Sequence, residues 1–210
     1  RVNGWKHTDN KIVNYPLEHF KVNEKDFIIK LDENNKIELF ARNGSSRTKF
    51  KEKIRNYKLD DSSKIYSLNK NYFWKGDNFG NENKFITELP DSSNNFLVFS
   101  NDKENYVNNY IVSSSNNLYL LDSDFNISST YSEIEYFIDE LSLARIKDES
   151  FIVCKGKNQF DIFNNKLERQ TQVSLDYNDF LTVFDIDNNN KLNYFTNSNN
   201  FIFNNEILLD

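Results

Sequence analysis

The chain has 210 residues, of which 38% are hydrophobic and 15% aromatic, so it carries enough bulky apolar side chains for a packed core and does not have a disordered composition. Its formal net charge is −6 and its basic residues are dispersed, which argues against nucleic acid as a partner because no basic stripe is available. A single cysteine, Cys154, excludes an internal disulfide or a cysteine-based metal site, and we expect it to be a small buried side chain.

Short apolar runs alternate along the chain with turns rich in Asn, Asp and Ser, a pattern that predicts strands. One motif, a polar residue followed by an aromatic and two mostly apolar residues, recurs five times. Its aromatic positions are Phe27, Tyr72, Tyr110, Phe151 and Tyr194. Successive copies lie 38 to 45 residues apart, which is the length of one four-stranded blade of a β-propeller.

Each copy of the motif is flanked by further apolar runs that complete the blade. A second run follows and makes a hairpin, with Asn expected to supply the positive φ of the tight turns because the chain has only 5 Gly. A strand is also expected before each hairpin. These preceding strands are predicted at residues 17–22, 65–68, 96–99, 141–146 and 180–184.

The predicted fold class is therefore all-β, a β-propeller of about five four-stranded blades. Residues 1–210 form one propeller domain, or a segment of a seven- or eight-bladed propeller belonging to a longer protein. The expected blades are residues 16–58, 59–91, 92–134, 135–176 and 177–210. One segment, 131–145, also has the spacing of a helix face, so a short inserted helix and a pair of strands both stay open there.

The sharpest local motif is the run from Asp185 to Asn193, which places oxygen-bearing side chains at alternate positions. A hard cation such as Ca²⁺ prefers six to eight oxygen ligands. The candidate ligands are Asp185, Asp187, Asn189, the main-chain carbonyl of Lys191, and Asn193. The loop is not an EF-hand, because Asn replaces the usual Gly at position 190 and Thr the usual Glu at position 196. A polar β-turn without metal is the open alternative. A degenerate copy of the loop, residues 100–108, is expected to keep only the turn shape.

This loop, placed before an inner strand, resembles the calcium-loop repeats of integrin-type (FG-GAP) propellers and related bacterial surface propellers. In addition, residues 4–44 are similar to propeller-bearing envelope proteins of Bacteroidetes-type bacteria. The resemblance implies a periplasmic, cell-surface or secreted protein with a non-enzymatic role.

No catalytic group of residues can be assembled from the sequence. The two histidines, His7 and His19, have no nucleophile in a suitable context, and no Gly-rich phosphate loop is present. No apolar stretch is long enough for a membrane-spanning helix. The predicted function is a non-catalytic interaction module that binds a protein or a glycan. The alternative is a glycosidase-type domain, in which carboxylates of several blades would converge on a channel.

Overall fold

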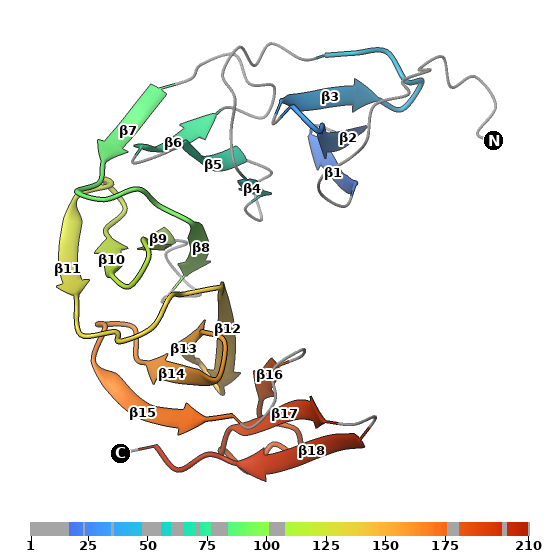
Figure 1. Ribbon diagram of the computed structural model, residues 1–210. Coiled ribbons are helices and arrows are strands. Elements are labelled where there is room, and N and C mark those ends of the chain that lie inside the picture. The colour runs from blue at the N-terminus through green and yellow to red at the C-terminus, as the bar shows by residue number, and fades with distance from the viewer. Residues whose placement is uncertain are drawn as a thin grey trace. The chain divides into compact units, whose positions relative to one another are not determined.

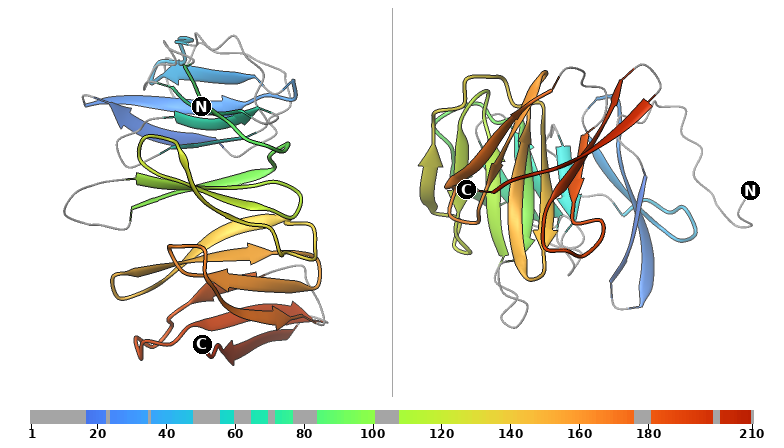
Figure 2. Two further views of the ribbon diagram at one scale, coloured as in Figure 1. Left: turned by 90° about the vertical axis from the view of Figure 1, so that its left-hand side faces the viewer. Right: turned by 90° about the horizontal axis from the view of Figure 1, so that it is seen from below.

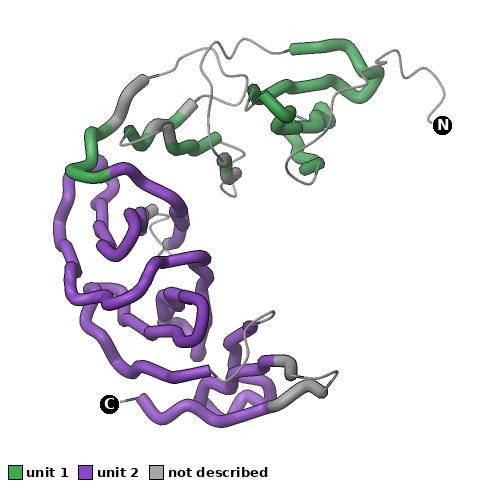
Figure 3. The backbone as a smooth tube through the Cα atoms, in the orientation of Figure 1, with its two compact units in different colours: residues 1–91 green, residues 92–210 purple. Residues whose placement is uncertain are grey.

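The computed structural model describes residues 17–22, 24–34, 36–47, 56–59, 65–69, 72–76, 84–100, 108–175, 181–198 and 201–209. Within these ranges the regular structure consists of eighteen strands and no helix, which confirms the all-β prediction. The strands form five antiparallel sheets in which each strand pairs with its neighbour in sequence. The chain divides into two compact units, residues 1–91 and 92–210 (Figure 3).

Unit 1 contains two sheets that share one core. The first has the order β1-β2-β3, with β1 Glu18–Val22, β2 Lys25–Leu31 and β3 Ile37–Ala41. The second has the order β4-β5-β6-β7, with β4 Asn56–Leu59, β5 Ile65–Asn69, β6 Tyr72–Gly76 and β7 Lys84–Glu88. Apolar side chains of β1, β2 and β3 pack with Tyr57 and Ile65 of the second sheet, so the two sheets bury a common set of side chains.

Unit 2 contains three sheets (Figure 1). The first comprises β8 Asn95–Ser100, β9 Asn108–Ser113, β10 Leu118–Leu121 and β11 Ile127–Tyr131. The second comprises β12 Glu140–Ile146, β13 Glu149–Lys155, β14 Gln159–Phe163 and β15 Arg169–Ser174. The third comprises β16 Leu181–Phe184, β17 Asn193–Ser198 and β18 Phe201–Glu206. The first strands of these sheets are neighbours, because β12 contacts both β8 and β16.

The second sheet of unit 2 is covered on both faces, and Figure 2 shows it between the other two. Side chains along β13 alternate between the two cores. Ile152 and Cys154 pack toward the β8–β11 sheet, whereas Phe151 and Val153 pack toward the β16–β18 sheet. Both faces are therefore apolar, as expected for a sheet buried between two others. Cys154 is buried, as predicted, and its burial raises the pKa of the thiol well above the usual range.

Two turns of unit 2, β10–β11 and β14–β15, are fixed by side-chain hydrogen-bond acceptors. Asp122 Oδ1 accepts the N–H groups of Asp124 and Asn126, each at 2.9 Å. Asn164 Oδ1 does the same one sheet later, at 2.9 and 3.0 Å. The positive φ falls on Phe125 (67°) and Leu167 (66°). In both turns the Asx side chain fixes the turn while a different residue adopts the left-handed φ. The positive φ that the sequence assigned to Asn is found at Asn188 and Asn190, but not at Asn34, Asn116 or Asn117.

Two further sequence predictions are corrected in unit 1. Four of the five repeat aromatics lie in the second strand of their sheet, but Tyr72 lies in the third strand, β6. Residues 56–58, expected at the end of the first blade, belong to β4, which pairs with β5. Spacing alone cannot decide such assignments, because two adjacent apolar strands of one hairpin carry similar patterns.

The segment 131–145 is not a helix. Tyr131 ends β11, residues 132–139 form an irregular connection, and β12 begins at Glu140. The alternative of two strands is confirmed, because the segment takes in the end of β11 and most of β12, with an irregular connection between them. We call residues 132–139 the crossover segment, since it joins the last strand of one sheet to the first strand of the next.

Candidate interaction site

The crossover segment alternates between inward and outward side chains. Ile134 and Ile138 are 2% and 0% exposed and belong to the core between the β8–β11 and β12–β15 sheets. Tyr136 is partly buried against the same core. The intervening side chains are exposed and form what we call the crossover face. They are Glu133, Glu135, Phe137 and Asp139.

Hydrogen bonds fix the crossover segment to both neighbouring sheets. The N–H of Ile138 donates to the carbonyl of Ser115 in the β9–β10 turn at 2.9 Å. The N–H of Asp139 donates to the carbonyl of Lys155 at the end of β13 at 2.8 Å. The carbonyl of Asp139 accepts from the Asn95 side chain at 3.0 Å. The segment therefore lies on the end of the sheets that carries the β9–β10 and β13–β14 turns, and it is held as part of the scaffold.

Tyr136 anchors the middle of the segment. Its hydroxyl donates to the carbonyl of Cys154 at 2.8 Å. Its ring lies over Gly156, where a Cβ would come within 2.7 Å of the Tyr136 Cε2 atom and 3.0 Å of Cγ. The tyrosine can lie this close because residue 156 has no side chain. Burial, with nearby Asp161, raises the pKa of Tyr136 far above its usual value, so the hydroxyl stays a donor.

A buried carboxyl group, Asp161 of β14, lies near Tyr136. The side chain is fully buried, and its Oδ1 lies 3.6 Å from Nη1 of Arg169. The guanidinium of Arg169 also lies 5.7 Å from the centre of the Tyr131 ring. Burial raises the pKa of Asp161, against the opposing effects of the Tyr136 hydroxyl and Arg169, and the charge of Glu135 raises it further.

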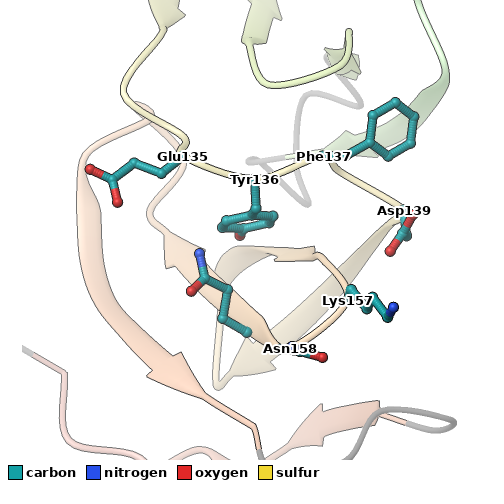
Figure 4. Close-up of a pocket in the computed structure, with 7 residues that line it drawn as sticks. Glu135, Tyr136, Phe137, Asp139, Lys157 and Asn158 are labelled. Carbon is teal, nitrogen blue, oxygen red and sulfur yellow. The ribbon is translucent and has the colours of Figure 1, made fainter.

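Three hollows follow the crossover segment, and Glu135 lines all of them. The largest, about 470 Å³, lies between the segment and the β13–β14 turn and is drawn in Figure 4. A second, about 290 Å³, lies toward the β9–β10 turn, and a third, about 380 Å³, lies toward Arg169 and Gln172 of β15. Phe137 lines the first two hollows, and its side chain is 56% exposed. Figure 4 shows the Phe137 ring pointing away from the side on which Tyr136 lies.

This site was not predicted from the sequence, because the residues around Phe137 also have the spacing of a helix face, and that spacing was considered instead of the alternating pattern. A signal was nevertheless present. Ile134, Tyr136 and Ile138 are apolar at every second position, with acidic or exposed residues between them. This period of two is that of an extended chain with one side buried.

The predicted calcium loop follows β16 and lies apart from the crossover segment in sequence. Asp185 accepts the N–H of Asn189 through Oδ1 at 3.1 Å and that of Asn190 through Oδ2 at 3.0 Å. Asn189 Nδ2 donates to Asp187 Oδ2 at 3.0 Å, and its Oδ1 accepts the N–H of Lys191 at 2.9 Å. Asn193 begins β17 and is buried. Several of the proposed ligand oxygens thus accept hydrogen bonds from the loop itself, and calcium binding stays a prediction.

Across the described ranges, no three His, Cys, Asp or Glu side chains are grouped in a way that would hold a metal ion. His19 contacts Asp26 at 2.9 Å on the exposed side of the β1–β2 hairpin. His7 lies outside the described residues, as does most of the 100–108 loop. Within the described residues there is also no helix long and apolar enough to span a membrane.

Comparison with known proteins identifies the fold. No family model matches the chain, and no curated protein matches it. Among solved structures, it is similar to BBS1N crystallised in complex with ARL6DN, with a TM-score of 0.67 at 10% identity over 92% of this chain. It is also similar to the Dos1 propeller, with a TM-score of 0.56 at 13% identity over 80% of this chain. The chain spans 62% and 50% of those two proteins. The β-propeller prediction is confirmed, and the chain has the fold of a propeller segment.

Proposed function

We propose that this chain is a non-catalytic interaction module of a larger protein and that it binds a protein partner through the crossover face. The observation that carries the proposal is Phe137, an exposed aromatic ring between two hollows on a segment whose backbone is fixed at both neighbouring sheets. Exposed aromatic side chains on a rigid scaffold are typical anchors of protein interfaces.

The geometry of the segment supports this function. Loops positioned by a rigid scaffold are where binding residues concentrate, and the turns on either side of the crossover segment lie on the same end of the sheets. One propeller of similar fold, BBS1N, was crystallised in complex with another protein, ARL6DN. That structure supports a protein partner as the class to test first.

A glycosidase-type activity is less well supported. Such an enzyme needs a protonated carboxyl group that can reach the glycosidic oxygen, paired with a second carboxylate. Asp161 has the raised pKa of an acid, but its side chain is fully buried. An external sugar therefore has no access to this group. The raised pKa reflects a buried polar contact in the scaffold.

The resemblance to envelope propellers extends the proposal to a bacterial cell-surface, periplasmic or secreted setting, and to a glycan as an alternative ligand. Both stay predictions. A glycan would also use an exposed aromatic ring, so the experiment must separate it from a protein.

Site-specific photo-crosslinking in the full-length parent protein tests the proposal. A benzophenone side chain at position 137 is expected to give a protein adduct that purified wild-type chain suppresses by competition. The matched control places it at position 149, where Glu149 is exposed at the far end of β13 from Lys155. Equal adducts at both positions, or none at 137, contradict the proposal. A carbohydrate adduct at position 137 would mean that the ligand of this face is a glycan and not a protein.

A further inference from the structure

We infer that the partner segment recognised by the crossover face is an extended peptide with Lys or Arg at alternate positions around one apolar side chain. This inference rests on the proposed function and specifies its ligand. It follows from three properties of the face: its charge, its repeat and the position of its aromatic ring.

The charge of the crossover face is acidic. Glu133, Glu135 and Asp139 are all exposed, so three acidic side chains of the face are open to solvent. Two basic side chains lie near these carboxylates. Lys157 lines the largest hollow on the side opposite the crossover segment, and Arg169 lines the third hollow but is already paired with Asp161. Complementary charge in a partner therefore means basic side chains, which also favour rapid encounter.

The spacing of the face matches an extended ligand. Its four side chains occupy every second position of an irregular segment in which exposed and more buried side chains alternate, so neighbours lie at most about 7 Å apart along the chain. Alternate side chains of an extended peptide have the same repeat. A helix would present same-side residues at a shorter rise, so Lys or Arg at every second position of a strand-like peptide fits best.

Phe137 sets where the apolar side chain lies. The ring borders the hollows of about 470 and 290 Å³, so a Leu- or Val-sized side chain can pack on either of its sides. An Arg next to that side chain can also stack on the ring. Acidic partners, including nucleic acid and anionic lipid surfaces, are disfavoured by the three carboxylates.

Fluorescence anisotropy with a labelled peptide tests the inference on the full chain. The probe carries alternating Lys and Arg around a central Leu, and two control peptides carry Glu in place of the basic residues or the same basic residues in one contiguous run. We expect the alternating peptide to bind most tightly and the Glu peptide not to bind. Binding should also weaken between about 50 and 200 mM salt, because exposed charges are screened over this range.

Variants of the face separate its contributions. Glu135→Gln should weaken binding about two- to fivefold, the effect of one exposed ion pair, and Phe137→Ala about tenfold. Lys157→Ala should strengthen binding by a similar two- to fivefold, because it removes a like charge from the largest hollow. Glu149→Gln and Ile186→Ala are the matched controls, since both positions are exposed and lie outside the face. All of these side chains are exposed, so unchanged circular dichroism is expected throughout.

The inference is wrong if the Glu peptide binds as well as the alternating peptide, or if Glu149→Gln weakens binding as much as Glu135→Gln. It is also wrong if no basic peptide binds. If position 137 still crosslinks to a protein in that case, the proposed function stands and only the ligand is wrong. If position 137 gives no adduct either, both fail.

Discussion

Replacing Gly156 with Ala tests how Tyr136 holds the crossover segment in place. A Cβ at position 156 would lie 2.7 Å from Cε2 of Tyr136 and 3.0 Å from Cγ, and both atoms belong to a ring that is fixed by its own hydrogen bond to Cys154. Gly156 is not among the residues with positive φ, so the backbone itself can accept alanine. The expected cost therefore comes from the contact with the ring.

The magnitude follows from the two ways in which the clash can be relieved. If the ring moves, the carbonyl of Cys154 loses its donor, which costs about 1 to 3 kcal/mol for a buried group. If the ring stays, overpacking costs about 1 to 3 kcal/mol. Because alanine restricts the unfolded chain more than glycine does, the substitution also stabilises the folded state by about 0.4 to 1 kcal/mol. We expect Gly156→Ala to lower the free energy of unfolding of unit 2 by about 1 to 2 kcal/mol.

The assay is a double-mutant cycle with Tyr136→Ala, followed by amide hydrogen exchange of β13 and β14, which report on unit 2 alone. Once the ring is gone, Gly156→Ala should be neutral or slightly stabilising. Tyr136→Phe is the matched control, because it keeps the clash and removes only the hydrogen bond. If Gly156→Ala costs the same with and without the Tyr136 ring, the contact between them does not hold the segment.

Three further predictions concern charge and turns. Burial raises the pKa of Asp161 in the folded state, so the contribution of this group to stability should be fully present below its unfolded pKa, near 3.9, and should be lost as the pH rises through its folded-state pKa. Asp161→Asn should remove this loss. Urea titrations across pH test the prediction, and an equal loss of stability in the wild type and in Asp161→Asn would contradict it. The N–H of Asn126 is the main cause that lowers the pKa of Asp122, so its contribution should be present above the unfolded pKa and disappear as the pH falls through the folded one. Asp122→Ala should lower the free energy of unfolding, measured by thermal unfolding, by about 1 kcal/mol. Asp122→Asn should lower it much less, because Asn164 forms the same turn in the next sheet. Equal losses for the two variants would refute the role of this side chain in the turn. If the 185–193 loop binds Ca²⁺ with a Kd of about 1 mM, 10 mM Ca²⁺ should stabilise the chain by about 1.4 kcal/mol, and Asp185→Ala should abolish that gain. The measurement is Tm with and without Ca²⁺, and an unchanged Tm would rule out the metal prediction.

The sequence by itself determined the fold class. Aromatic and β-branched residues in short runs, repeated about every forty residues, specify strands and the length of the repeating unit, because these are local properties of the chain. They also located the strands that begin each sheet of unit 2, such as β12 at residues 140–146. The burial of Cys154 followed from the same pattern.

Pairing and the interaction site depended on contacts between segments far apart in the chain. Tyr57 and Tyr72 could be assigned to their strands only when the partner of β5 was known, since similar apolar runs fit more than one pairing. The crossover segment is not a helix, because Ile134 and Ile138 enter a core made by two different sheets and because Tyr136 fits over Gly156. A helix would satisfy the same residues locally, so only burial against two sheets decides that Phe137 faces outward.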